Sequence, residues 1–211
     1  MGTTALFGGS FDPVHAGHLA VARQVLDLFA VDRLWFIPAK ISPLKACGMA
    51  ASDEDRLAML RLVAAGEPRF GVSDCELRRG GVSFTVDTLR RWRASHPGDE
   101  LLFVAGMDSL LTLSRWRDCL AITRLCRFVT FARPGCERPR PEELGLPPDV
   151  SAKLLADIFD GDPHDVSSSE VRASLAAGRG VEGLVPPPVL RYIVSRGLYC
   201  GRPDRGAGGA G

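Results

Sequence analysis

The chain has 211 residues, of which 45% are hydrophobic, so it can bury one continuous core and is expected to form a single domain. Its 26 basic and 25 acidic side chains leave a net charge of +1, which argues against broad electrostatic binding of nucleic acid or of a membrane surface. Any anion must therefore be bound at a local site.

The six cysteines contain no C-x-x-C pair, and no cationic, apolar leader precedes the first apolar run. No apolar stretch approaches the ~18 residues of a membrane span. Leu6 also breaks the pattern for N-terminal myristoylation. We therefore expect a cytoplasmic protein with reduced thiols and no membrane partner.

Short apolar runs alternate with segments of helical period along the chain. The helical spacing is kept by Leu19, Ala22 and Leu26, and again by Leu57 and Leu60. Ser52 with Asp55 resembles a capping box at the start of the second helix. Alternation of strand and helix predicts an α/β fold with a doubly wound parallel sheet and helices on both faces. The expected strands are Thr4–Phe7, Leu34–Ile37, Phe70–Ser73, Leu101–Ala105 and Phe128–Ala132.

The C-terminal third is less regular. Residues 134–148 hold five prolines and are expected to form a surface loop. One domain is expected over residues 1–200, with a small helical part at about 165–200. The glycine-rich segment 201–211 is expected to be a disordered tail.

Residues 8–19 read GGSFDPVHAGHL and follow the first predicted strand. Gly8 and Gly9 would let the backbone approach a ligand, and Pro13 would stiffen the loop. His15 and His18 can lie on one face of a helix start, beside its exposed amides, and together these groups suit a phosphate. Read separately, the glycines could serve only a tight turn, and the histidines could be a surface pair or could bind a metal with Asp12.

A second motif, VSSSEVR, lies at residues 166–172. Ser167 with Glu170 would form a capping box, with Arg172 solvated. Hydroxyls and free amides at a helix start, followed one turn later by Arg172, would also suit a second phosphate clamp. The segment alone does not decide between these interpretations.

Taken together, these motifs resemble those of a known superfamily. The string G-G-S-F-D-P-x-H-x-G-H resembles the signature of the H-x-G-H nucleotidyltransferases, which have a Rossmann-like fold, and residues 167–172 resemble their second motif, with Ser169 in place of threonine. The segments SFTVDTL, GMDS, RPG, LVP and GLY occur in the order found in bacterial nicotinate-nucleotide adenylyltransferases. This resemblance extends from residue 4 to about residue 199.

The resemblance implies transfer of AMP from ATP to nicotinate mononucleotide, giving deamido-NAD and pyrophosphate. The acceptor's own phosphate would attack the α-phosphate of ATP in line, without a covalent enzyme intermediate. Catalysis would then consist of alignment and charge neutralisation. The implied catalytic residues are His15, His18, Lys45 and Arg172. The implied ATP-binding residues are Gly8, Gly9, Ser10, Phe11, His15, His18, Gly106, Asp108, Arg133, Ser168, Ser169 and Arg172.

The acceptor is implied to lie against Trp116, with its carboxylate near Thr85. Arg117 could add attraction for a carboxylate over a neutral amide, and Lys40 and Lys45 complete the implied acceptor-binding set. Core packing remains an alternative role for Trp116. Mg²⁺ is implied as the counter-ion of ATP, with no dedicated metal cluster in the chain.

Two positions depart from the family pattern. Ser42-Pro-Leu-Lys45 stands where a P-P-H-K or P-P-H-R loop is usual, and Met107 stands where a small residue is usual. Both departures bear on substrate affinity and leave the reaction class intact. The string GRGVEG at 178–183 follows a predicted helix and is rejected as a dinucleotide fingerprint.

Two rival functions stay open at this stage. One is an H-x-G-H adenylyltransferase that acts on nicotinamide mononucleotide or phosphopantetheine, and the other is a non-catalytic nucleotide-binding module. The sequence leaves the oligomeric state open, a homo-oligomer included. It also leaves open the strictness of the acid-versus-amide preference and the role of residues 134–148.

Overall fold

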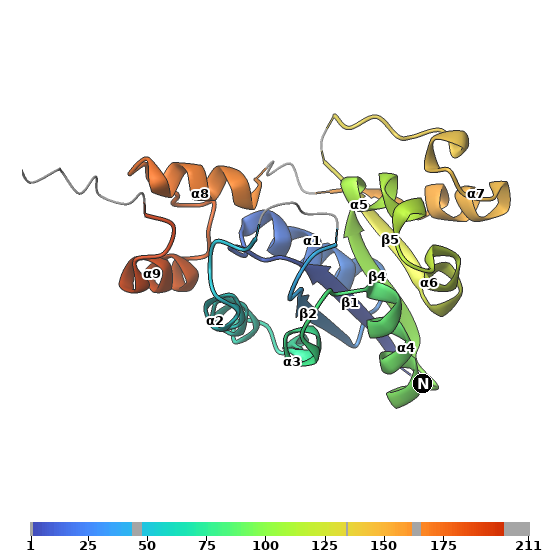
Figure 1. Cartoon of the computed structure of the whole chain (residues 1–211), viewed down its shortest axis with the longest axis horizontal. Helices are drawn as coiled ribbons and strands as arrows, with labels where there is room; N and C mark the ends of the chain where they lie inside the picture. The colour runs from blue at the N-terminus through green and yellow to red at the C-terminus, as the bar shows by residue number, and fades with distance from the viewer. Residues whose placement is uncertain (1, 44–47, 134, 162–165, 201–211) are drawn as a thin grey trace, which may run out of the picture.

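The fold is built on one parallel sheet with the strand order β3-β2-β1-β4-β5-β6 (Figure 1). The computed structural model describes residues 2–43, 48–133, 135–161 and 166–200. The order reverses between β1 and β4, and a ligand crevice is expected at such a point, beyond the carboxyl ends of the strands. The strands are β1 (Thr3–Gly9), β2 (Arg33–Pro38), β3 (Phe70–Val72), β4 (Glu100–Gly106), β5 (Arg127–Ala132) and β6 (Ile158–Asp160).

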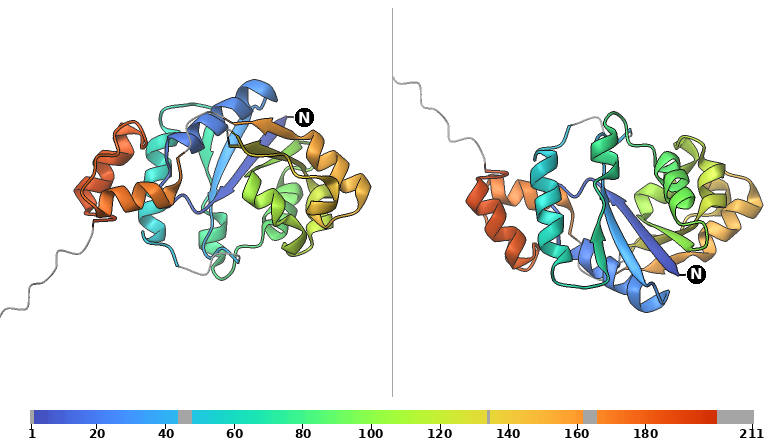
Figure 2. Two further views of the ribbon diagram at one scale, coloured as in Figure 1. Left: turned by 90° about the horizontal axis from the view of Figure 1, so that it is seen from above. Right: turned by 90° about the horizontal axis from the view of Figure 1, so that it is seen from below.

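Helices cover both faces of the sheet (Figure 2), which confirms the predicted fold class. Helices α1 and α2 pack on one face, and α8 and α9 extend that layer at one end of the molecule. Helices α4, α5, α6 and α7 pack on the other face. The helices are α1 (Ala16–Leu28), α2 (Asp53–Ala64), α3 (Cys75–Arg79), α4 (Thr85–Ser95), α5 (Met107–Leu111), α6 (Cys119–Leu125), α7 (Pro148–Ala156), α8 (Ser168–Ala176) and α9 (Pro187–Arg196), with short 3-10 helices η1 (Leu113–Arg115) and η2 (Pro141–Leu144).

Strand β1 shows why the apolar runs are continuous. Ala5 and Phe7 belong to the core on one face of the sheet, whereas Leu6 belongs to the core on the other face. All three side chains are buried. The middle of a central strand in a doubly covered sheet has no solvent face, so consecutive positions there are apolar.

All five predicted strands are confirmed, and a sixth was missed. β6 has three residues and pairs in parallel with the end of β5. A strand this short carries too little sequence pattern to be recognised, and its position depends on pairing with β5. Of the capping box expected at the start of α2, the N-cap half is present: Ser52 Oγ accepts from the Asp55 amide at 3.1 Å. The Asp55 carboxylate accepts from the Ser52 hydroxyl at 2.8 Å, in place of the reciprocal bond to the Ser52 amide.

The expected loop at residues 134–148 is only partly correct. It contains η2, and Leu144 at the end of η2 is completely buried in the second core. This apolar side chain anchors the segment against α7 and α5. Gly178 follows the end of α8 with φ +67°, as expected for a helix C-terminal glycine. The predicted tail at 201–211 lies outside the described residues.

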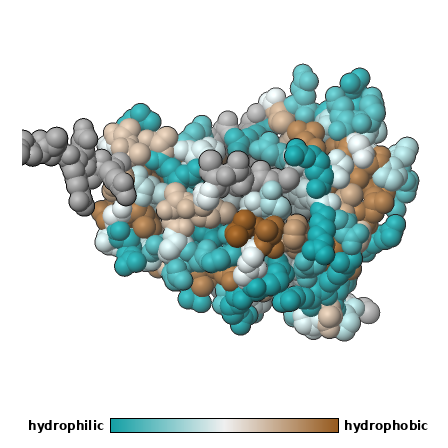
Figure 3. All heavy atoms as spheres, viewed as in Figure 1, coloured by the Kyte–Doolittle hydropathy of each residue, from teal (hydrophilic) through white to brown (hydrophobic). Residues whose placement is uncertain are grey.

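Figure 3 shows one face of the molecule, on which hydrophilic side chains dominate and apolar groups form small separate patches. None of the helices in the described ranges is long and apolar enough to cross a membrane. The cysteines in these ranges carry free thiols. Burial raises the pKa of the Cys126 thiol to about 12, so this thiol stays protonated at neutral pH.

Candidate active site

The loop from β1 to α1 brings His15 and His18 together. His15 is the N-cap of α1, and its backbone N–H donates to Nδ1 of His18 at 3.2 Å. The two imidazole rings lie 3.7 Å apart between centroids. Because Nδ1 of His18 accepts this bond, a neutral His18 carries its ring proton on Nε2. The local fold thereby gives His18 a hydrogen-bond donor of defined position.

His15 has a different character because it is buried. Burial lowers the pKa of His15 to about 4, and the positive charge of Arg133 lowers it further, against the opposing effect of Glu170. His15 is therefore neutral at neutral pH. The same electrostatic coupling shows that the structure brings Arg133, at the end of β5, close to His15 and Glu170.

Phe11 has its ring in the core beneath the loop. The ring is 1% exposed and contacts His18 edge-on at 5.0 Å between centroids. It also contacts Phe7 and Phe36 in the same way. The predicted ATP contact of Phe11 would thus fall to its backbone, while its ring supports His18.

The second predicted motif lies against the first. Ser168 Oγ at the start of α8 donates to the Pro13 carbonyl at 2.9 Å, and Arg172 donates to the Asp12 carbonyl at 2.6 Å. Arg172 also donates to Ser169 Oγ at 3.2 Å. Segments 155 residues or more apart in the chain thus form one polar surface, as the phosphate-clamp interpretation requires.

The capping box of α8 is present in the same place. Ser167 Oγ accepts from the Glu170 amide, and the Glu170 carboxylate accepts from the Ser167 amide at 2.8 Å. The Ser167 hydroxyl also donates to the Glu170 carboxylate at 2.7 Å. The bonds that the carboxylate accepts from the hydroxyl and the amide of Ser167 lower the pKa of Glu170. The capping box is therefore compatible with a phosphate clamp, because the cap organises the helix start that carries Ser168 and Arg172. The expectation of a solvated Arg172 is wrong, since its side chain is half-buried and bonded to the Asp12 carbonyl.

Asp12, considered from the sequence only as a metal ligand with the histidines, has a structural role that the sequence did not reveal. Its carboxylate accepts from the amides of Ala50 and Ala51, at 2.7 and 3.0 Å, and from the Tyr199 hydroxyl at 2.7 Å. Burial and this bond raise the pKa of Tyr199. With its oxygens engaged in this way, Asp12 does not fit the alternative of a metal ligand beside the histidines. Instead, Asp12 holds the loop from β1 to α1, which we call the phosphate loop, to the segment before α2 and to Tyr199 after α9.

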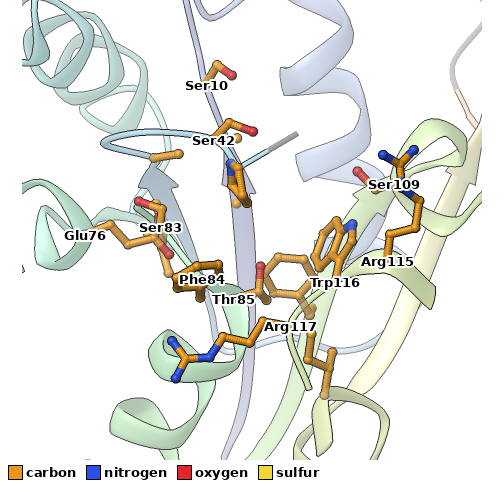
Figure 4. Close-up of a pocket in the computed structure, with 17 residues that line it drawn as sticks. Ser10, Ser42, Glu76, Ser83, Phe84, Thr85, Ser109, Arg115, Trp116 and Arg117 are labelled. Carbon is orange, nitrogen blue, oxygen red and sulfur yellow. The ribbon is translucent and has the colours of Figure 1, made fainter. Parts of the chain in front are cut away.

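A cavity of about 220 Å³ opens beside this loop at the point where the strand order reverses (Figure 4). The backbone of Gly8, Gly9 and Ser10 forms one side of it. A Cβ on Gly8 would meet the Phe103 ring at 3.0 Å, which explains the glycine at that position. The opposite side is formed by Phe84, Thr85, Trp116 and Arg117.

The acceptor-side residues come together as expected. Thr85 is the first residue of α4, so its amide lies at a helix N-terminus, where an anion is favoured. Trp116 is half-buried, lines the cavity, and donates from Nε1 to Thr112 Oγ1 at 3.4 Å. It also contacts Phe103 and Phe128, so it combines core packing with an exposed ring face.

Arg117 turns away from Trp116. Its guanidinium lies over the Phe84 ring at 4.9 Å and pairs with Asp87 at 3.6 Å, and Figure 4 shows the side chain passing beneath Phe84. The Arg117 side chain is 57% exposed, so solvent screens this pair. The charge of Arg117 is thus at the edge of the cavity and partly offset by Asp87.

Of the predicted ATP-binding residues, only Gly8, Gly9 and Ser10 line the cavity; the histidines and the start of α8 lie outside it. Three more of the set lie at neighbouring strand ends, also outside the cavity wall. Gly106 ends β4, Asp108 is exposed on α5, and Arg133 follows β5. The position of a Cβ on Gly106 meets only open space. Met107, the unusual residue between them, is 5% exposed and packs in the core.

The two predicted lysines have different outcomes. Lys40 donates to the Asp53 carboxylate and its backbone amide donates to Ser83 Oγ at 2.9 Å. Lys45 and Leu44 lie outside the described residues, so their predicted roles stay predictions. The cavity is also lined by Glu76 and Arg115, for which the sequence offered no signal. Ser83 and Ser109 line it too; they lie in the SFTVDTL and GMDS segments but were not predicted as site residues.

No three His, Cys, Asp or Glu side chains among residues 2–43, 48–133, 135–161 and 166–200 are grouped so that they could hold a metal ion. The donors around the phosphate loop are imidazoles, hydroxyls, amides and guanidinium groups. These groups suit phosphate oxygens better than a hard cation, which prefers carboxylate, carbonyl and water ligands.

A parallel sheet with a crevice where its strand order reverses, and two helix starts rich in donors beside that crevice, define a nucleotide-binding α/β protein of the Rossmann-like class. Residues 6–174 match the family described as "Cytidylyltransferase-like". In the solved structures, a Plasmodium falciparum nicotinic acid mononucleotide adenylyltransferase complexed with NaAD superposes with a TM-score of 0.74 at 18% identity, covering 94% of this chain and 98% of that one. That likeness concerns the fold.

Relatives with closer sequences carry a more specific name. A "Probable nicotinate-nucleotide adenylyltransferase" of Geobacter sulfurreducens is 39% identical, with 93% of this chain and 97% of the relative covered. Relatives of the same name from Symbiobacterium thermophilum and Opitutus terrae are 39% and 40% identical, and cover 99% and 94% of this chain and 100% and 97% of their own lengths. The chain belongs to the nicotinate-nucleotide adenylyltransferase group of the cytidylyltransferase-like family.

Proposed function

We propose that this protein transfers AMP from ATP to nicotinate mononucleotide, forming deamido-NAD and pyrophosphate in NAD biosynthesis. The observation that carries this proposal is the His15–His18 pair. Its backbone-to-ring hydrogen bond gives His18 an Nε2–H donor, in a phosphate loop that borders a cavity with Thr85 and Trp116 on its far side. The loop that carries the histidines thus forms one side of the cavity with Gly9 and Ser10, and a ring-sized apolar surface lies on the other side.

The attack step needs alignment and charge neutralisation more than covalent chemistry. In the proposed reaction an oxygen of the acceptor phosphate attacks the α-phosphorus of ATP, and pyrophosphate leaves from the opposite side. Nε2–H of His18 would donate to the α-phosphate, where negative charge increases in the transition state. The amides of Gly9 and Ser10 would support the same group.

The leaving pyrophosphate would lie at the start of α8. Ser168, Ser169 and Arg172 are brought there by their contacts with the phosphate loop. Arg172 keeps a permanent positive charge, which suits a leaving group whose charge rises during the reaction. Neutral His15 would donate one hydrogen bond to a phosphate oxygen. Arg133 adds positive potential on the same side.

The acceptor would occupy the opposite wall. The pyridine ring would stack on Trp116, and its carboxylate would receive hydrogen bonds from the amide and hydroxyl of Thr85 at the start of α4. Lys40 and Lys45 are proposed to contact the acceptor phosphate, and Lys45 also to cover the phosphates of ATP. Adenine is proposed to lie near Gly106 and Asp108.

Magnesium enters this proposal as the counter-ion of ATP. It would neutralise phosphate charge and keep most of its hydration shell, since the described side chains offer no carboxylate cage. We also propose a cytoplasmic location, where free thiols persist and both substrates are made. A homo-oligomer remains an open prediction.

The test is magnesium-dependent pyrophosphate release with three acceptors in separate assays: nicotinate mononucleotide, nicotinamide mononucleotide and phosphopantetheine. The proposal predicts the highest kcat/KM with nicotinate mononucleotide and formation of deamido-NAD. A higher kcat/KM with another acceptor would replace the substrate while keeping the chemistry. Absence of release with all three would favour a non-catalytic nucleotide-binding module.

A further inference from the structure

Arg56 on α2 is a fully buried charge whose guanidinium faces the phosphate loop. Its side chain is 0% exposed. One terminal nitrogen donates to the Ser10 carbonyl at 2.7 Å, and the other donates to the Asp53 carboxylate at 2.6 Å. A buried arginine is costly unless it is paired and hydrogen-bonded, so its location calls for a specific role.

The Ser10 carbonyl, which accepts this bond from Arg56, lies between the cavity wall and the residue that supports His18. It belongs to the peptide that joins Ser10, which borders the cavity, to Phe11, whose ring supports His18. Phe11 has φ +48°, in the left-handed region that bulky residues avoid, so its backbone must be held there by its surroundings. Arg56 supplies a fixed hydrogen bond at this peptide.

The other branch of the guanidinium acts on the loop after β2 through Asp53, the first residue of α2. Asp53 accepts from both Arg56 and Lys40. Burial alone would raise the pKa of Asp53, but its hydrogen bonds with Lys40 and Arg56 lower it below its usual value, so the carboxylate stays charged at neutral pH. Arg56 thus connects the phosphate loop, through Asp53, to a lysine on the next loop of the same sheet edge.

We propose that Arg56 is a positioning residue for the adenylyl transfer. It holds the Ser10–Phe11 peptide, and through it the amides of the loop and the His18 ring, in the geometry that the transition state requires. Through Asp53 it also holds Lys40 in a fixed relation to that loop. Arg56 contacts backbone and carboxylate and acts on the reaction through them. This inference rests on the proposed function.

The kinetic test compares Arg56→Met and Arg56→Lys with wild type, and with Arg61→Met as the matched control on the exposed side of α2. Misplacement of the loop by about 1 Å predicts a fall in kcat of roughly 100-fold for Arg56→Met. Arg56→Lys keeps the buried charge but replaces the two separate terminal nitrogens of the planar guanidinium with a single nitrogen, so its kcat is also expected to fall by more than tenfold. Arg61→Met is expected to keep wild-type kcat.

Asp53→Asn separates the two branches. It keeps the bond from Arg56 to the Ser10 carbonyl and weakens the hold on Lys40. The expected result is a raised KM for nicotinate mononucleotide with kcat changed less than threefold. An equal loss of kcat in Asp53→Asn and Arg56→Lys, with KM unchanged in both, would contradict the division of roles.

A readout independent of activity is the tautomer of His18, measured by ¹⁵N NMR of the imidazole. Wild type is expected to show the Nε2–H form alone, and both Arg56 variants a mixture of the two neutral forms. A folded Arg56 variant with wild-type kcat and the wild-type tautomer would overturn the inference and leave Arg56 a purely structural residue. If wild type itself releases no pyrophosphate with nicotinate mononucleotide, the proposed function fails, and the tautomer still tests Arg56.

Discussion

The two walls of the cavity are held in different ways. On the phosphate side, Asp12 and His15 are buried, and the hydrogen bonds of Asp12 connect the loop after β1 to the segment before α2 and to Tyr199 after α9. On the acceptor side, Arg117 and its partner Asp87 are substantially exposed, and their contacts are local. The phosphate wall is therefore fixed by buried polar contacts, whereas the acceptor wall is held by ion pairs and ring contacts that solvent screens.

This difference suits the chemistry that we propose. Charge develops on the phosphate oxygens in the transition state, and donors that are fixed in advance there lower the barrier without reorganisation. Recognition of the acceptor ring requires a surface that fits the ring and a modest electrostatic attraction, which half-exposed groups such as Trp116 can supply. Changes on the phosphate wall are therefore expected to be costly, and changes on the acceptor wall mild.

The largest expected effect is on the rate after removal of the central donor. His18→Ala is expected to lower kcat by about 10³-fold, because one hydrogen bond to the reacting phosphate is lost while substrate binding is largely kept. Steady-state kinetics of pyrophosphate release measures this. His96→Ala is the matched control, since His96 is exposed at the end of α4. A loss of less than tenfold in His18→Ala would contradict the role of the fixed donor.

The next effect is on stability. Asp12→Asn places an amide where Ala50, Ala51 and Tyr199 all donate to a carboxylate, so at least one buried donor loses its partner. The expected loss is about 3 kcal/mol in the free energy of unfolding, measured by urea denaturation. Asp149→Asn, an exposed change on α7, should change it by less than about 0.5 kcal/mol. Equal stabilities of the two variants would show that the phosphate wall is not held through Asp12.

A smaller effect is the pH dependence that buried His15 introduces. The pKa of His15 is about 4 in the folded protein and near 6.5 when unfolded, so the unfolded chain binds more protons between these values. Stability is expected to fall by about 2 kcal/mol from pH 7.5 to pH 5. His15→Gln should flatten this dependence in urea denaturation at the two pH values. The same slope in both proteins would show that His15 is not the group responsible.

The smallest effect is expected on the acceptor wall. Arg117→Ala should reduce the preference for nicotinate over nicotinamide mononucleotide by only about fivefold, because the charge is exposed and shared with Asp87. The ratio of kcat/KM for the two acceptors gives the answer. Arg124→Ala, on the exposed side of α6, is the control. An unchanged ratio would leave selectivity to Thr85 and Trp116.

Residue patterns were sufficient where function depends on local sequence. A signal within about ten residues marks each of the strands, the glycine loop, the paired histidines and the start of α8. These signals were enough to predict that the loop, the histidines and the start of α8 lie at the carboxyl ends of the strands. The structural roles of Asp12, Arg56 and Tyr199 could not be predicted in this way, although Asp12 and Tyr199 lie within recognised segments, because these roles come from contacts with parts of the chain distant in sequence. β6 was missed for a similar reason, since three residues hold too little pattern.

The most direct test of the account is the stereochemical course at the α-phosphorus. A single diastereomer of ATP, chiral by sulfur substitution at the α-phosphate, is turned over with nicotinate mononucleotide, and the configuration of the dinucleotide product is determined by ³¹P NMR. Direct in-line transfer on a prepositioned phosphate wall predicts inversion. Retention would reveal two displacements and a covalent enzyme intermediate, which would contradict the account.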